Sequence, residues 1–276
     1  MDYVNWNLSS TYRRYREADA IVLSVGKSGR TWLRVMLGKY LALHAGVEFD
    51  LDTRPVGMPR VVYDHELWAW RRMNWRRRWM GYHVCPDALL RRKKVVLLYR
   101  DPRDVVVSLS FQRNNRSGGS TSVSLKELVR PPHDLVQAIV DVMNTWYRRL
   151  AAHEDTFWLS YEALKRDPVA ELTHLVTHLG LTPNPKVIEA AVAFAAFDNM
   201  KKMEAGGEFQ SRILRPGDPG DPDSFKVREG KVGGYRKHFD ADDMVVVDRA
   251  LGGLACFYGY FPSRPDEASA DINPQI

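Results

Sequence analysis

The stretch from Ala20 to Leu41, AIVLSVGKSGRTWLRVMLGKYL, decides the fold. A short apolar run begins at Ile21, and a glycine-bearing turn follows from Gly26 to Thr31. From Trp32 onward, apolar residues recur at helical spacing. A strand, a turn and a helix in this order form a cradle, in which turn amides and the helix N-terminus converge on an anion. The stretch therefore predicts a phosphate site at the end of a strand.

Two other interpretations of this turn stay open at this point. The nucleotide P-loop has a glycine five residues before its Gly-Lys-Ser, and this chain has Ile21 there. A simple strand-to-helix turn with a solvated lysine at Lys27 is the other alternative. A second motif is needed to decide among them.

Composition and charge narrow the class of protein. A length of 276 residues with 45% hydrophobic residues fits a single α/β domain spanning 1–276, with 1–19 and 263–276 at its periphery. The chain has no apolar run that approaches the roughly 18 residues of a membrane span. Residues 1–19 are polar and lack the apolar core of a signal peptide. Cys85 and Cys256 form neither a disulfide framework nor a metal cluster, so we expect a cytoplasmic protein without a metal.

The net charge of +6 favours an anionic ligand. Arginine and lysine cluster at 71–72, 76–78 and 91–94, each of which is alternatively a solvated basic face. Zinc-finger spacings and RNA-binding aromatic motifs are lacking, so we expect no nucleic-acid partner. No pattern predicts an oligomeric state.

A second motif lies in the stretch from Lys94 to Gln112, KVVLLYRDPRDVVVSLSFQ. Its continuous apolar run predicts a strand buried on both faces. Arg100 ends the strand, and Asp101-Pro102 is typical of a helix start. Ser108 follows on that helix, so Arg100 and Ser108 can bind one phosphate together.

Two histidines are candidates for a catalytic base. The segment 59–65 predicts a short strand that ends at His65, where an α/β fold places site residues. His83 has a weaker setting. The alternative for His65 is a surface histidine in a loop.

Farther along the chain we expect a helix at 134–152, a strand at 157–161 and a closing helix at 241–258. Prolines at Pro168 and Pro185 each predict the start of a further helix. Residues 225–236 combine three glycines with four basic residues, which suits a loop that closes over an anion, or equally a surface turn.

Taken together, these segments resemble the sulfotransferases that use 3′-phosphoadenosine 5′-phosphosulfate (PAPS). Residues 27–32 are similar to the family's Lys-Ser-Gly-Thr-Thr-Trp loop, and residues 100–104 with Ser108 are similar to its second motif. The resemblance implies a P-loop-like central parallel sheet with helices on both faces. It also implies PAPS as donor, its desulfated product PAP (3′,5′-adenosine bisphosphate), and no metal.

The resemblance also implies roles for individual residues. The family binds the 5′-phosphosulfate and adenine with the loop that here comprises Lys27, Ser28, Gly29, Arg30, Thr31 and Trp32. It binds the 3′-phosphate with residues that match Arg100, Ser108, Arg228, Glu229 and Gly230. Tyr161 and Phe197 match residues near the nucleotide. His65 matches the catalytic base, with His83 as the alternative, and Lys27 is the second catalytic residue.

Several positions depart from the family's pattern. Arg30 replaces a threonine of the first loop, and Tyr63 stands where many members have a lysine. Ala195 lies near a position where a hydroxyl residue is common, and Glu229 replaces a lysine. These departures indicate a divergent, bacterial-type member whose donor site is largely intact.

We therefore expect in-line transfer of a sulfuryl group from PAPS to a hydroxyl or amine of a small-molecule acceptor. Two other functions compete with it. A small-molecule kinase needs Mg²⁺ and the missing P-loop glycine. A non-catalytic protein that binds nucleotides or polyanions predicts binding without turnover.

Overall fold

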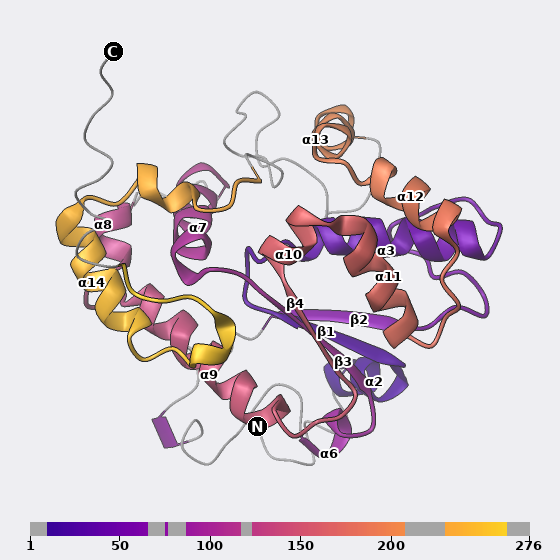
Figure 1. Cartoon of the computed structure of the whole chain (residues 1–276), viewed down its shortest axis with the longest axis horizontal. Helices are drawn as coiled ribbons and strands as arrows, with labels where there is room; N and C mark the ends of the chain where they lie inside the picture. Colours follow the sequence, from indigo (N-terminus) through magenta and orange to yellow (C-terminus); the bar gives the residue numbers. More distant parts are fainter. Residues whose placement is uncertain (1–9, 66–74, 77–86, 117–122, 208–229, 264–276) are drawn as a thin grey trace.

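Four parallel strands form one central sheet (Figure 1). They are seen in a computed structural model that describes residues 10–65, 75–76, 87–116, 123–207 and 230–263. The strand order is β2-β1-β3-β4. The strands are β1 (Ala20–Ser24), β2 (Val61–His65), β3 (Lys94–Tyr99) and β4 (Thr156–Ser160).

Helices surround this sheet and connect its strands. They are α2 (Ser10–Glu17), α3 (Arg30–His44), α6 (Asp87–Leu90), α7 (Pro102–Arg116), α8 (Leu125–Leu128), α9 (Leu135–Leu150), α10 (Tyr161–Arg166), α11 (Pro168–His178), α12 (Pro185–Phe194), α13 (Phe197–Gly206) and α14 (Ala241–Leu251). Two short 3-10 helices, Gly234–Lys237 and Cys256–Tyr258, flank α14. Among the helices described, none combines the length and apolar character needed to cross a membrane.

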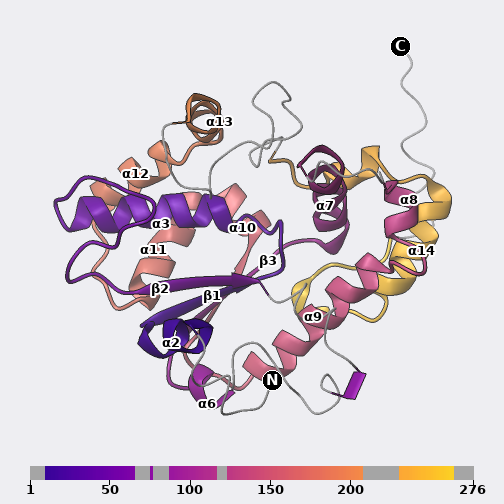
Figure 2. The ribbon, with the colours of Figure 1, turned by 180° about the vertical axis from the view of Figure 1, so that it is seen from behind.

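Side chains of the strands alternate between two cores. Ile21 and Leu23 of β1 belong to the core built with α2, α7, α9 and α14. Ala20 and Val22 belong to the core built with α3, α11 and α12. Figure 2 shows α3, α11 and α12 on one side of the sheet, with α2 and α9 on the other. The predicted parallel sheet with helices on both faces is confirmed.

Most helix starts follow the sequence signals. The side chain of Asp167 accepts a hydrogen bond from the N–H of Ala170 at the start of α11, and Asn184 caps α12 in the same way. The closing helix expected at 241–258 is shorter, because α14 ends at Leu251 where Gly252 and Gly253 follow. Two adjacent glycines make continued helix unfavourable.

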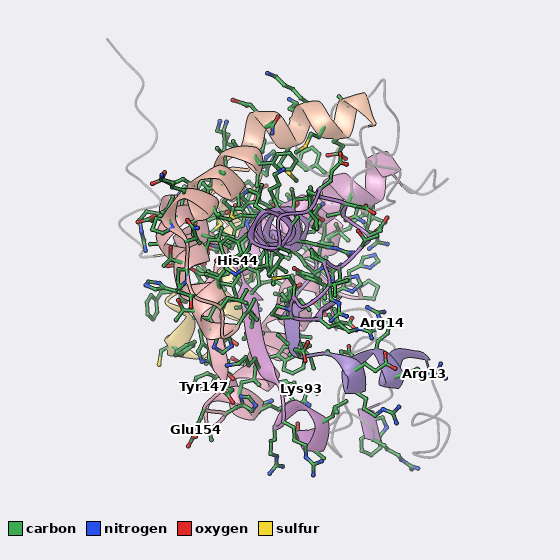
Figure 3. The ribbon with its side chains drawn as sticks, turned by 90° about the vertical axis from the view of Figure 1, so that its right-hand side faces the viewer. Arg13, Arg14, His44, Lys93, Tyr147 and Glu154 are labelled. Atoms are coloured by element: carbon green, nitrogen blue, oxygen red, sulfur yellow. The ribbon has the colours of Figure 1, made fainter. Side chains whose placement is uncertain are left out.

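The segment 10–18, expected at the periphery, instead contributes to the core. Tyr15 of α2 is 1% exposed, and its hydroxyl donates a hydrogen bond to the carboxylate of Asp64. Nζ of Lys93 donates to the carbonyl oxygens of Arg16 and Ala18, at 2.9 and 2.5 Å, which ties α2 to the start of β3 (Figure 3). A single buried tyrosine among arginines does not form an apolar stripe along the helix. The sequence pattern therefore did not predict that α2 packs against the core.

The strand order places a topological switch point beside β1. The chain leaves β1 through α3 to reach β2 on one side, and β3 lies on the other. In the register, Ser24 pairs with His65 of β2 and with Leu98 of β3. Tyr99 pairs with Ser160 of β4. The residues that follow each strand therefore meet at one edge of the sheet, where open α/β folds bind ligands.

A polar network joins the carboxyl ends of β3 and β4. Asp101 accepts hydrogen bonds from the backbone N–H and the guanidinium of Arg103, at 2.9 and 2.7 Å. Glu162 accepts from the backbone N–H of Asp101 at 3.1 Å and from the hydroxyl of Tyr260 at 2.6 Å. Burial raises the pKa of Glu162 above its ordinary value, and these two donors act in the opposite direction. The C-terminal segment thus holds both strand ends in place.

We expect Tyr260→Phe to lower the free energy of unfolding by about 1–3 kcal/mol, because the partly buried Glu162 loses a donor. When a carboxyl group has a higher pKa in the folded state than in the unfolded state, the fold loses stability as the pH rises from the lower pKa through the higher one. The loss should therefore be larger at neutral pH than at acid pH. Urea unfolding measures it. In a Glu162→Gln background the loss should shrink, and an equal loss there would contradict this assignment.

Candidate active site

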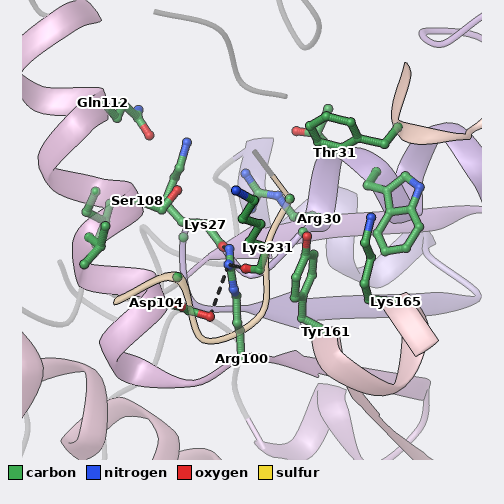
Figure 4. A pocket seen from close by; sticks show the side chains of 18 of the residues that line it. Lys27, Arg30, Thr31, Arg100, Asp104, Ser108, Gln112, Tyr161, Lys165 and Lys231 are labelled. Atoms are coloured by element: carbon green, nitrogen blue, oxygen red, sulfur yellow. Dashed lines mark hydrogen bonds and ion pairs between the residues drawn. The ribbon is translucent and has the colours of Figure 1, made fainter. Parts of the chain in front are cut away.

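One pocket of about 460 Å³ lies at the carboxyl edge of the sheet (Figure 4). Ser108 and Gln112 of α7 line one side, and Tyr161 and Lys165 of α10 line the other. The structure brings together most of the predicted site residues, which are Lys27, Gly29, Arg30, Thr31, Trp32, His65, Arg100, Ser108, Tyr161, Phe197 and Gly230. Three other predicted residues, His83, Arg228 and Glu229, lie outside the described residues.

The turn between β1 and α3 has the backbone shape of an anion cradle. Lys27 has a φ of 71° and Gly29 a φ of 90°, both in the left-handed region. A Cβ on Gly29 would lie 2.6 Å from Cδ2 of Tyr161, so a side chain does not fit there. No side chain of the described residues caps α3 at Gly29. The first-turn N–H groups of α3 therefore face the pocket edge as donors for an anion.

Ser28 has a different environment from its neighbours in this turn. It is fully buried and is not among the residues that line the pocket. Its hydroxyl oxygen has no hydrogen-bond partner in the described part of the chain. A buried polar atom of this kind calls for a partner that the described residues do not supply.

Arg100 is the central cation of the pocket. Its Nη1 donates to the carbonyl oxygen of Lys27 at 3.3 Å, and its Nη2 donates to that of Lys231 at 2.8 Å. Its guanidinium lies 4.2 Å from the centre of the Tyr161 ring. Its Nε is buried without a partner in the described residues. Arg100 thus connects the cradle to the segment that begins at Gly230, and keeps one donor for a ligand.

Asp104 anchors that segment to α7. Its Oδ2 accepts from the N–H of Gly233 at 2.9 Å, and its Oδ1 accepts from the N–H of Tyr235 at 3.0 Å. Oδ2 also lies 3.4 Å from Nη2 of Arg100, an ion pair that Figure 4 marks. The side chain of Asp104 is 2% exposed, so these contacts are shielded from solvent. They bring Lys231 to the pocket wall.

The side of the pocket near β4 is aromatic. Nε1 of Trp32 donates to the carbonyl oxygen of Ala195 at 2.8 Å, and the Trp32 ring meets the Tyr161 ring edge-on at 5.9 Å. Nζ of Lys165 lies 5.7 Å from the Trp32 ring centre and 5.2 Å from that of Phe197. Burial raises the pKa of Tyr161, so its hydroxyl stays protonated. Fixed aromatic rings beside a cation suit a planar, electron-rich ligand.

The side of the pocket near β2 carries the predicted base. Nδ1 of His65 lies 3.8 Å from Oδ1 of Asp64. The same oxygen accepts from the backbone N–H of His65 at 2.5 Å. Burial alone would raise the pKa of Asp64, but hydrogen bonds from His65 and Tyr15 outweigh it and hold that pKa below its ordinary value. An ionised carboxylate therefore faces one ring nitrogen of His65.

Several residues that line the pocket were not predicted as site residues from the sequence. These are Arg34, Tyr63, Asp104, Gln112, Lys165, Lys231 and His238. Helical spacing was an available signal for some of them, because Arg34 lies one turn after Arg30 and Lys165 one turn after Tyr161. Lys231 directly follows the predicted Gly230, whereas His238 has no local signal.

Most of the chain is similar to known proteins. A family model described as "Sulfotransferase domain" matches residues 17–253. Cytosolic sulfotransferase 17 of Arabidopsis thaliana is 23% identical over 265 residues, which cover 84% of this chain and 73% of that protein. The amine sulfotransferase of Oryctolagus cuniculus is 23% identical over 260 residues, which cover 85% of this chain and 79% of that one.

Solved structures show the same fold. A mouse sulfotransferase complexed with PAP has a TM-score of 0.62 and 18% identity, and the match covers 90% of both chains. A retinol dehydratase in complex with retinol and PAP has a TM-score of 0.61 and 17% identity. The family model spans the segments that build the cradle, both walls and the anchored loop, so the chain belongs to the sulfotransferase domain family.

Proposed function

We propose that this chain transfers a sulfuryl group from PAPS to a hydroxyl or amine of a small-molecule acceptor. The observation that carries the proposal is one pocket with two anion-binding ends. The cradle with Lys27 forms one end, and Arg100 with Ser108 forms the other. Relatives of this chain are named for flavonols, amines and a hydroxysteroid, and a structural neighbour is complexed with PAP.

The residues of the pocket fit such a donor. The buried Nε of Arg100, a residue of the pocket wall, has no partner within the described residues. The first turn of α3 offers N–H groups at Gly29, where a Cβ would collide with Tyr161. PAPS, when bound, supplies an activated sulfuryl group whose leaving group is a phosphate.

The cradle side stabilises charge on that phosphate. Lys27 lines the pocket beside the uncapped first turn of α3, so charge that develops there meets a preorganised environment. Arg30 adds a guanidinium beside the same turn. We assign Lys27 the catalytic role, since positioning and charge stabilisation supply most of the rate in group transfer of this kind.

Residues of both pocket walls recognise the nucleotide. Arg100 and Ser108 bind the 3′-phosphate, with Arg228, Glu229 and Gly230 as the closing loop. Trp32, Tyr161 and Phe197 hold the adenine, and Lys165 lies over two of these rings. The roles of Arg228 and Glu229 stay predictions, because these residues lie outside the described residues.

His65 accepts the proton from the acceptor. Asp64 faces Nδ1 of His65, which leaves Nε2 for the acceptor oxygen or nitrogen. An imidazole serves as a base at neutral pH, and general-base catalysis typically contributes about 10²–10⁴-fold. His83 stays the alternative base outside the described residues.

Calorimetric binding of 3′,5′-adenosine bisphosphate, 5′-AMP and ATP with Mg²⁺ tests the donor. We expect the bisphosphate to bind about tenfold or more tightly than 5′-AMP, because it adds charge-assisted hydrogen bonds at Arg100 and Ser108. A preference for ATP would favour a kinase instead. Binding without turnover of PAPS on any acceptor would favour a non-catalytic nucleotide-binding protein.

We expect Ser108→Ala to weaken the bisphosphate about tenfold while 5′-AMP binds as before, because the hydroxyl contacts only the 3′-phosphate. Ser110→Ala is the matched control on the same helix. Its hydroxyl donates to the carbonyl of Val107 and does not line the pocket. Equal weakening of both nucleotides by Ser108→Ala would show that Ser108 does not read the 3′-phosphate.

His65→Ala should lower turnover about 10²–10⁴-fold and leave affinity for the bisphosphate nearly unchanged. His174→Ala, an exposed histidine of α11, is the control and should keep full turnover. Initial rates of PAP release measure both. If His65→Ala keeps a rate near that of the unmodified protein, the base is elsewhere, and His83→Ala is measured next.

A further inference from the structure

We infer that the acceptor carries a carboxylate or another oxyanion group, which Arg30 and Arg34 of α3 bind beside the reacting hydroxyl or amine. The inference rests on the proposed function and names its substrate class. Its basis is the half of the pocket beside β2, in which Arg34 and Tyr63 have no role in the donor assignment.

Side chains on two different faces of α3 line the two halves of the pocket. Trp32 faces Tyr161, at the end of β4. Arg30 and Arg34 are four residues apart, and thus share a different face of the helix. Both line the pocket together with Tyr63 of β2. Because β2 and β4 are the outer strands of the sheet, the arginine side lies away from the side assigned to the adenine.

Arg34 is held in position before any ligand binds. Its Nη2 donates to the carbonyl oxygen of Leu51 at 3.2 Å, and its guanidinium lies 5.4 Å from the centre of the Tyr63 ring. Asp52 lies 3.8 Å from the same nitrogen, but its side chain is 55% exposed. An exposed ion pair at that distance contributes little and leaves the charge of Arg34 largely available. A fixed guanidinium binds a planar carboxylate with little loss of side-chain freedom.

The guanidinium of Arg30 has no ion-pair partner among the described residues. It makes no hydrogen bond or ion pair with any residue that the structure describes. Burial lowers its pKa, the positive charges of Arg34 and Arg14 act in the same direction, and Asp64 opposes them. A desolvated cation without a bonded counterion is costly, so an anion at this place is stabilising.

The carboxylates near this half of the pocket already have partners. Asp104 is the one carboxylate among the described residues of the wall, and the N–H groups of Gly233 and Tyr235 bind it. Asp64 bonds to Tyr15 and to His65 and does not line the wall. The bound donor would compensate part of the charge of Arg30, but Arg34 would keep only its exposed partner Asp52 if the acceptor were neutral. An oxyanion on the acceptor would pair with Arg34 and with the remaining charge of Arg30.

A substitution at Arg34 tests acceptor binding without changing the donor site. Arg30 begins α3 beside the cradle, so its loss would affect both the phosphosulfate and the acceptor. Arg34 lies one turn further along and contacts Tyr63 and Leu51. The test therefore uses Arg34→Gln, and Arg91→Gln is the matched control, since Arg91 is an exposed arginine just before β3 that does not line the pocket.

The experiment compares acceptors that differ only in charge. The full chain is given PAPS and three acid–amide pairs, which are 4-hydroxyphenylacetate with its amide, 4-hydroxycyclohexanecarboxylate with its amide, and β-alanine with its amide. We expect kcat/KM for the acid to exceed that for the amide about tenfold or more in the pair whose nucleophile fits, the effect of a charge-assisted hydrogen bond. Arg34→Gln should reduce this ratio to within about threefold of one, and Arg91→Gln should leave it unchanged.

The outcomes distinguish the inference from the proposed function. Affinity of Arg34→Gln for the bisphosphate, measured by calorimetry, should equal that of the unmodified protein. The inference is overturned if acid and amide turn over equally, or if the acid-to-amide ratio of kcat/KM is unchanged in Arg34→Gln. In either case, turnover of PAPS still supports the proposed function. Failure to bind the bisphosphate overturns both. If no pair reacts, binding of each pair to the bisphosphate complex is measured, and absence of a preference for the acids overturns the inference.

Discussion

The contacts of the Arg100 guanidinium, whose side chain is 11% exposed, are the interactions on which the rest of the site depends. The guanidinium donates to the carbonyl oxygens of Lys27 and Lys231, and pairs with Asp104. These three residues come from the cradle, the C-terminal loop and α7, which are distant in sequence. A charge in this position is tolerated because both Nη atoms have partners, while Nε keeps a donor for a ligand. The same contacts set the spacing between the two ends of the pocket.

Close packing around Tyr161 supplies the second constraint. Its ring lies against Gly29 of the cradle, and its hydroxyl lies near Gly230 of the anchored loop. Both glycines have positive φ, and a Cβ on Gly230 would lie 2.7 Å from the Phe197 ring. The backbone thus approaches an aromatic ring closely at two places, and a side chain would fit at neither. Glu162, the next residue, ties this arrangement to Tyr260 and Asp101.

The two halves of the pocket differ in character, and this difference underlies the proposals. Aromatic rings and Lys165 line the β4 side, while Arg30, Arg34 and His65 line the β2 side. Asp64 links the β2 side to the core through Tyr15, so α2 supports the carboxylate that faces the histidine. The departures of this chain from its family at Arg30 and Tyr63 both fall on the β2 side.

The amino-acid sequence by itself determined the parallel strands, the cradle at Lys27 and Gly29, and the strand end at Arg100. Each of these depends on short-range physics, namely apolar runs, helix caps and glycine turns that act over a few neighbouring residues. The burial of Tyr15, the anchoring of the Gly230 loop by Asp104 and the position of His238 were decided by tertiary structure alone. Those features depend on which segments meet across the sheet, because a long-range contact leaves no periodic signal in either segment.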